Sequence, residues 1–290
     1  MEGLTRRVSS AVAVVFAIVA PLSAQTNLRV PSFATPPALA ESRPPAQAPL
    51  GDPGVDSEQV VQQPAGPPPT PRHTGIKAML KGLGTDVKHL PSRQNLFWVG
   101  VGGGLALAAH PFDDNVNRAL VGSSRADKVF KPGEILGELP TLLGSASIVY
   151  AVGRFKDEPK VSHVGMDLIR SLLIAEGLTQ ALKYTTRRER PDLSGRNSFP
   201  SGHAADTFAF ATALERHLGW RGALPAYMFS SYVAISRLPA NRHWLSDAVF
   251  GSTVGIIAGR TVTRHGREEF PVAVAFVPGG AEVMFVRNGR

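Results

Sequence analysis

Three short clusters of basic, hydroxyl and imidazole side chains within residues 183–247 constrain this chain more than any other feature of its sequence. The clusters are Lys183-Tyr-Thr-Thr-Arg-Arg-Glu-Arg190-Pro191, Pro200-Ser-Gly-His203, and Ser236-Arg237 followed by His243 and Asp247. Each cluster has the residue pattern of a helix end or of one helix face. We therefore expect a helical fold in which these segments supply one site.

The first cluster predicts a basic helix that ends at a proline. Lys183 and Arg190 are seven residues apart, so on a helix they lie on nearly the same face, about two turns apart. Pro191 has no N–H and disfavours helix at the preceding residue, so the helix is expected to stop with Arg190 at its mouth. The alternative is an ordinary solvated helix end, where basic side chains are favoured by the helix dipole.

The second cluster predicts a helix start, because Ser201 is a suitable N-cap for the helical run at 204–218. The unpaired N–H groups and partial positive charge of a helix N-terminus bind anions. Gly202 would let the backbone approach an oxyanion without a side chain in the way. An ordinary helix cap with no ligand remains the alternative.

In the third cluster, His243 and Asp247 are four residues apart and would share a helix face. The carboxylate could then hold one ring nitrogen, which fixes the tautomer and leaves the other nitrogen free to attack or to bind. A lone histidine is more often a packed or surface residue. Here Arg237 precedes His243 by six residues, and Pro239 breaks the helix between them.

Together the clusters resemble the three-part signature of the type 2 phosphatidic acid phosphatase (PAP2) superfamily. That signature reads Lys-x6-Arg-Pro, Pro-Ser-Gly-His and Ser-Arg-x5-His-x3-Asp, and every position is matched here. The resemblance implies an all-α fold, a PAP2-like helical bundle. Vanadium-dependent haloperoxidases share the same pocket, because vanadate resembles phosphate in its transition-state geometry.

The resemblance also implies a role for each residue of the signature. His243 would be the nucleophile that forms a phosphohistidine, Asp247 would orient it, and His203 would be the general acid. The groups that bind phosphate would be the side chains of Lys183, Arg190, Arg237 and Ser201 and the N–H of Gly202. No metal or other cofactor is implied. A neutral nucleophilic histidine and a protonated acid histidine predict a bell-shaped pH profile.

The N-terminal quarter of the chain predicts export. Two arginines, a mostly apolar run at 11–22 and the small residues Ser23 and Ala24 are typical of a secretory signal peptide at residues 1–24, with an uncleaved membrane anchor as the alternative. Twelve of the 24 prolines lie between Pro31 and Pro71, so residues 25–74 are expected to form a disordered linker. An exported chain of this kind would be periplasmic, or membrane-associated and facing the periplasm.

Residues 75–266 are expected to form the helical phosphatase domain. Their uninterrupted apolar stretches are shorter than the 18 or more residues expected of a membrane span, which favours a soluble or surface-bound bundle. The wording His243-Trp-Leu-Ser-Asp247 is closer to the secreted acid phosphatases of the superfamily, although many other relatives are multi-span lipid phosphatases. Residues 267–290 contain two β-rich runs around Pro278-Gly-Gly280 and predict a small C-terminal β-hairpin packed on the bundle.

Other polar residues carry weaker signals. Asp113 and Asp114 invite a metal-binding interpretation, but a turn or helix cap after Pro111 is favoured. We expect four histidines to be structural or exposed, because none has a partner at ligand spacing: His89, His110, His163 and His217. The chain has no cysteine, which excludes thiol chemistry and thiolate metal sites.

The net charge of +8 favours anionic substrates or an anionic membrane surface, whereas no nucleic-acid-binding pattern is present. The leading hypothesis is a metal-independent phosphohydrolase acting on phosphate monoesters or lipid (pyro)phosphates, that is, an acid phosphatase or a lipid phosphatase. The alternatives are a vanadium-dependent haloperoxidase and a noncatalytic exported binding protein. The sequence leaves the oligomeric state open, and also whether four aromatic residues line an apolar groove or belong to the core: Phe208, Phe210, Trp244 and Phe250.

Overall fold

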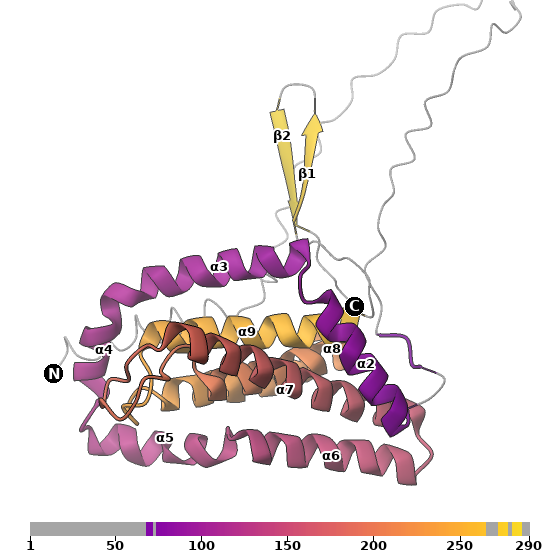
Figure 1. Cartoon of the computed structure of the whole chain (residues 1–290), viewed down its shortest axis with the longest axis horizontal. Coiled ribbons are helices and arrows are strands. Elements are labelled where there is room, and N and C mark those ends of the chain that lie inside the picture. Colours follow the sequence, from indigo (N-terminus) through magenta and orange to yellow (C-terminus); the bar gives the residue numbers. More distant parts are fainter. Residues whose placement is uncertain (1–67, 72–73, 265–271, 278–279, 286–290) are drawn as a thin grey trace, which may run out of the picture.

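The computed structural model describes residues 68–71, 74–264, 272–277 and 280–285 (Figure 1). The predicted signal peptide and nearly all of the predicted linker lie outside the described residues, so these two segments and the domain boundaries stay predictions. Within the described part of the chain the fold is mostly helical, which confirms the all-α class.

The helices follow one another with mostly short connections, and the longest joins Thr186 to Gly202. Their bounds are Ile76–His89 (α2), Arg93–Ala109 (α3), Asp113–Leu120 (α4), Ser124–Leu136 (α5), Leu139–Phe155 (α6), Pro159–Thr186 (α7), Gly202–Ser236 (α8) and Leu245–Arg264 (α9), with a short 3-10 turn at His110–Phe112. Helices α7, α8 and α9 form the centre of the bundle, between α3 on one side and α5 and α6 on the other (Figure 1).

Small residues bring α8 and α9 into close contact. Gly251, Gly255 and Gly259 form a stripe at four-residue spacing along α9. A Cβ built on Gly255 would lie 2.2 Å from the carbonyl oxygen of Ala205, and one on Gly251 would lie 2.4 Å from that of Ser201. The two backbones can approach this closely only without side chains at these positions, so the stripe sets the start of α8 beside the start of α9.

Helix α8 consists of two helical segments joined at Gly219, whose backbone (φ 75°, ψ 167°) is not helical. Glycine adopts this left-handed φ at little steric cost. The break follows directly after the helical run at 204–218 that the sequence predicts. It separates the segment that begins at the site from the apolar segment that ends at Ser236.

Helix α7 ends at Thr186, four residues earlier than the sequence predicts. Arg187 adopts a left-handed conformation (φ 47°), and its N–H donates to the carbonyl of Lys183 at 3.1 Å. This αL cap closes the helix before Pro191 can. Lys183 and Arg190 are therefore not on one helix face, as predicted, because Arg190 lies in the irregular segment that follows.

Two strands, Val272–Val277 (β1) and Gly280–Phe285 (β2), pair antiparallel, with Val272 opposite Phe285. The structure describes residues 267–290 only in part, so the predicted hairpin and its packing on the bundle stay predictions. None of the described helices is by itself long and apolar enough to cross a membrane. Taken as a pair, α5 and α6 satisfy that test of length and composition, although they are bent by 51° at the break between them.

Candidate active site

The structure brings all three sequence clusters to one end of the central helices. Lys183 lies in the last turn of α7, Ser201 is the N-cap residue of α8, and His243 lies just before α9. The N–H of Ser201 donates to the carbonyl of Asp247 at 3.0 Å, which ties the start of α8 to the first turn of α9. A Cβ on Gly202 would lie 3.5 Å from the Lys183 ammonium, so the helix N-terminus and this cation face the same space.

The cations of the first and third clusters influence one another. Burial lowers the pKa of Lys183, and the positive charges of Arg190 and Arg237 lower it further, while Glu176 acts in the opposite direction. Arg237 is itself buried, and burial and the charge of Arg190 contribute to lowering its pKa. The three cations therefore form one group although Arg190 is not on the helix. An anion bound among them would relieve their mutual repulsion.

Three donors in this group have no hydrogen-bond partner among the described residues. They are the hydroxyl of Ser201 and the Nε–H groups of Arg190 and Arg237, and all three atoms are buried. Ser201 occupies the N-cap position as predicted, but its side chain does not cap the helix. Most buried donors in proteins are satisfied. Unsatisfied donors supplied by three neighbouring segments are suited to the oxygens of a tetrahedral anion.

His243 is buried, and its Nδ1 lies 2.6 Å from the backbone carbonyl oxygen of Ser198. Asp247, which the sequence predicts as the group that holds the ring, is farther away, with its Oδ2 at 3.9 Å from the same nitrogen. The prediction placed both residues on one helix, but α9 begins only at Leu245. Nδ1–H donates to the carbonyl, so Nε2 is the nitrogen left for chemistry.

The protonation states of this pair suit a neutral nucleophile beside an anion. Burial lowers the pKa of His243, and Asp247 opposes this effect only in part. For Asp247, burial acts to raise the pKa, but His243, Arg188 and Ser198 outweigh it, so that the pKa is lowered. At neutral pH the imidazole is therefore neutral and the carboxylate is ionised.

The sequence analysis missed Arg188, which anchors Asp247. Its Nη1 donates to Oδ1 of Asp247 at 2.6 Å and to the hydroxyl of Ser246 at 2.7 Å, and its Nη2 donates to Asp113 at 2.8 Å. The only sequence signal was its place in the first cluster, where it is one of several basic residues. Its acceptors lie 58 to 75 residues away along the chain, so spacing could not reveal them.

Asp113 connects this network to α4. It begins that helix after Pro111, which agrees with the predicted turn or cap, but its carboxylate is buried and binds another helix. It accepts from the backbone N–H of Ser246 at 2.9 Å, in the first turn of α9. Its other oxygen lies 2.9 Å from Nδ1 of His110, which is exposed as expected but does have a partner.

The imidazole of His203 contacts α5. Its Nε2 lies 3.0 Å from the backbone carbonyl oxygen of Glu134, whose side chain also reaches Arg237 at 3.5 Å. Burial lowers the pKa of His203 to about 4, with a further contribution from the charge of Arg237. A bound phosphate dianion would offset that charge and favour the protonated imidazole that a general acid requires. No sequence pattern pointed to Glu134.

A further carboxyl group adjoins Lys183. Asp206, one turn into α8, is buried, and burial followed by the charge of Glu176 raises its pKa well above the ordinary value. Lys183 acts in the opposite direction. The raised pKa favours the neutral acid, so Asp206 leaves the positive charge of Lys183 available to an anion. The sequence analysis did not identify this residue.

An apolar cavity of about 310 Å³ lies one helical turn from His203. Thr207, which lines it, donates its hydroxyl hydrogen to the carbonyl of His203 at 2.7 Å. The other lining residues come from α5, α6 and α8: Leu136, Thr141, Leu142, Ser145, Phe210, Ala226, Phe229 and Ser230. Of the aromatic residues left open by the sequence, Phe210 lines this cavity, whereas Phe208 is fully buried in the core.

The model of the PAP2 superfamily matches residues 164–270. A lipid A 1-phosphatase from Porphyromonas gingivalis is 43% identical over 86 residues, which are 29% of this chain and 19% of that protein. A PA-phosphatase related-family protein from Dictyostelium discoideum is 29% identical over 125 residues, covering 33% of this chain and 46% of that protein. The chain therefore spans less than half the length of these curated relatives.

The fold is similar to that of a transmembrane PAP2 type phosphatidylglycerolphosphate phosphatase from Bacillus subtilis. The TM-score is 0.51 at 22% sequence identity, and the likeness covers 59% of this chain and 94% of the other. At this identity the likeness concerns the arrangement of the helices.

Proposed function

Because residues 164–270 belong to the PAP2 superfamily, we propose that this protein is a phosphohydrolase that works through a phosphohistidine on His243 and needs no metal for catalysis. The observation that carries the proposal is the set of three buried donors, from Ser201, Arg190 and Arg237, that have no hydrogen-bond partner among the described residues. Donors fixed in this way stabilise the charge on a transferring phosphoryl group without reorganising.

In the first step, Nε2 of His243 attacks phosphorus, the N–P bond forms and the bond to the leaving oxygen breaks. The proton on His203 passes to that oxygen, so the departing group leaves as a neutral alcohol or as a less charged phosphate. In the second step, water gives a proton back to His203 and its oxygen attacks phosphorus. The N–P bond breaks, and phosphate and neutral His243 are released.

The surroundings of His243 favour the charge that develops on its ring. The imidazole becomes cationic when Nε2 bonds to phosphorus, and its Nδ1–H then donates more strongly to the carbonyl of Ser198. Asp247 lies nearby as a carboxylate that Arg188 and Ser198 hold in place. Asp247 thus acts on the ring mainly through its negative charge. It also positions the ring indirectly, because it accepts a hydrogen bond from Ser198, whose carbonyl holds Nδ1.

Three observations favour a lipid phosphate as substrate. The apolar cavity at Thr207 and Phe210 lies on the side of the general acid, where the leaving group must sit. Two relatives have names that specify lipid phosphates, a lipid A 1-phosphatase and a phosphatidylglycerolphosphate phosphatase. Helix α3 also exposes apolar side chains, with Leu96 71% and Leu107 74% accessible, which is typical of a surface that meets a membrane or a partner.

The same observations support a location at a membrane surface. We propose that the site faces the periplasm, since residues 1–24 have the pattern of an export signal. The excess of basic residues would favour contact with anionic lipid headgroups.

Phosphate release by the purified full-length protein in detergent tests the proposal. We expect release in the presence of EDTA, with phosphatidic acid or isoprenyl pyrophosphate preferred over a soluble aryl phosphate. Equal or better turnover of the aryl phosphate would place the protein with the acid phosphatases and contradict the lipid assignment. Halide oxidation with vanadate and peroxide, without phosphate release from any substrate, would contradict the phosphohydrolase itself.

A further inference from the structure

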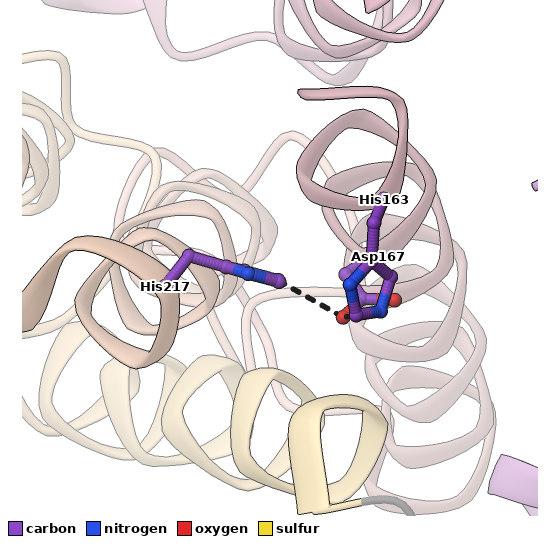
Figure 2. Close-up of side chains that lie close together, drawn as sticks. All are labelled: His163, Asp167 and His217. Atoms are coloured by element: carbon purple, nitrogen blue, oxygen red, sulfur yellow. Dashed lines mark hydrogen bonds and ion pairs between the residues drawn. The ribbon is translucent and has the colours of Figure 1, made fainter. Parts of the chain in front are cut away.

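A second buried polar cluster lies near the start of α7 and just before the break in α8 (Figure 2). His163 and Asp167 are one turn apart on α7, and His217 reaches them from α8. The three side chains are almost completely buried, with exposed fractions of 1%, 0% and 7%. Both histidines were expected to be structural or exposed, without a partner at ligand spacing; both are buried, but both pair with Asp167, which lies four residues from His163. Buried imidazole and carboxylate groups that converge from two helices need a chemical explanation.

The distances in this cluster match those between ligands of one metal ion. Nε2 of His163 and Nε2 of His217 lie 3.2 Å and 3.0 Å from the same Oδ2 atom of Asp167. All three potential ligand atoms lie within 4.8 Å of one another. Zinc binds nitrogen and oxygen ligands at about 2.0–2.2 Å in a tetrahedron, which places neighbouring ligands about 3.3 Å apart. An ion can therefore reach all three atoms with small rotations of the side chains.

The surrounding groups orient the carboxylate as a metal ligand would require. Nη2 of Arg170 pairs with the other oxygen of Asp167, Oδ1, at 3.1 Å, so that Oδ2 is directed to the histidines. The same guanidinium pairs with Asp86 through its Nε at 3.0 Å, so one cation serves two buried carboxylates. Outer partners of this kind fix ligating carboxylates in known metal sites. Because two carboxylates share one guanidinium, one negative charge is left that a bound cation would balance.

We propose that His163, Asp167 and His217 form a binding site for a divalent transition metal ion, with Zn²⁺ as the best fit and water as the fourth ligand. Two imidazoles and one carboxylate suit a borderline ion such as zinc. Calcium and magnesium prefer oxygen ligands throughout, so the two nitrogens disfavour them.

The position of the site assigns it a structural role. His163 and Lys183 are twenty residues apart on α7, which corresponds to about 30 Å along a helix axis. His217 lies two residues before the break in α8 at Gly219. The ion would clamp α7 to α8 at this break and leave the chemistry at His243 untouched, so the inference does not depend on the proposed function.

Metal content and thermal unfolding of the full-length protein test the site. Protein stripped with EDTA and then dialysed against Zn²⁺ should retain one zinc ion per chain by plasma mass spectrometry. Its unfolding midpoint should rise by about 5 to 10 °C when zinc is in about hundredfold excess over its dissociation constant. His217→Asn and Asp167→Asn should lose both the bound zinc and the rise. The matched control is His89→Asn, which removes an exposed histidine and should keep both.

The alternative is a metal-free cluster held by hydrogen bonds and ion pairs. In that case His217→Asn would lower the unfolding midpoint equally with and without zinc, and the unaltered protein would retain no zinc, which would overturn the proposal. Cobalt substitution gives a measurement that does not depend on stability. Co²⁺ bound to the stripped protein should show the visible absorption of a tetrahedral site, and this should be absent when Co²⁺ is added to any His217→Asn protein that remains folded. An octahedral-type spectrum, or the same spectrum in the variant, would contradict the site.

Discussion

Both ends of α7 carry buried polar groups, but the charges at the two ends are balanced in opposite ways. At the end that carries Lys183 and Ser201, cations gather and three donors have no acceptor among the described residues. At the end that carries Asp167, a carboxylate is met by two imidazoles and a guanidinium. The first arrangement suits an anion that comes and goes, and the second suits a positive charge that stays.

The difference also shows what sequence spacing can reveal. The residues of the first end lie in three compact clusters, so their pattern can be recognised from the sequence alone. At the second end, His163 and Asp167 are close in sequence, but His217 lies fifty residues beyond Asp167 and joins them only through packing of α7 on α8. Substitutions at the first end should have effects that range from nearly complete loss of activity to a small change in inhibition by phosphate.

Removing the proposed nucleophile should abolish nearly all phosphate release. His243→Ala is expected to lower kcat for phosphate release by at least about 10⁴-fold, because no other described imidazole replaces Nε2 there. His89→Ala, at an exposed position, is the matched control and should keep full activity. Acid-quenched protein should carry phosphate on histidine before the substitution and not after it. Unchanged turnover in a folded His243→Ala protein would refute the mechanism.

Removing the general acid should give a smaller loss and change the pH profile. His203→Asn is expected to lower kcat by about 10² to 10⁴-fold. Since the pKa of His203 is lowered to about 4, its protonated fraction falls as pH rises above that value, and kcat/KM should fall from acid to neutral pH.

Bound substrate should move that pH dependence. A phosphate dianion offsets the charge of Arg237, so the descending limb of kcat should lie at higher pH than that of kcat/KM. In His203→Asn only the titration of the substrate should remain. Coincident limbs in the unaltered enzyme, or an unchanged profile in the variant, would remove His203 from the acid role.

Removing the side chain that anchors Asp247 should show whether Arg188 positions that carboxylate or contacts the phosphate directly. Arg188→Ala is expected to lower kcat by about 10- to 100-fold with little change in KM, since Arg188 holds Asp247 and Asp113 rather than the phosphate. Arg187→Ala is the matched control, because this neighbour donates only to the carbonyl of Tyr184 among the described side-chain hydrogen bonds. A large rise in KM with unchanged kcat would instead indicate direct binding of phosphate by Arg188.

The smallest effect concerns the carboxylate that competes for Arg237. Glu134→Gln removes a negative charge at 3.5 Å from that guanidinium, so inorganic phosphate should inhibit about two- to fivefold more strongly at constant ionic strength. Glu138→Gln should have a weaker effect of the same sign, because Glu138 contributes less to the pKa of Arg237. Weaker inhibition in Glu134→Gln would show that Glu134 supports the binding of phosphate.

Much of the fold and of the site could be predicted from local patterns. The helical class, the start of α8 at Ser201 and the identity of the clustered cations follow from residue types at short spacing. The end of α7 was predicted wrongly, because a left-handed Arg187 closes the helix and nothing in its residue type requires that conformation. The same limit explains the ring of His243: the four-residue spacing to Asp247 implied a helix that in fact begins two residues later.

By itself, the sequence determined which side chains make up the candidate site, because the residue types and their spacing within each cluster are local properties. Only the tertiary structure decided which groups act on one another. The carbonyl of Ser198 holds His243, Arg188 joins Asp247 to Asp113, Glu134 reaches His203 and Arg237, and His217 meets Asp167. The contacts of Ser198 with His243 and of Arg188 with Asp247 lie inside the signature region, and the others join segments that no local pattern links. They exist because the glycine stripe of α9 and the packing of α7 on α8 bring distant segments to the same two ends of the bundle.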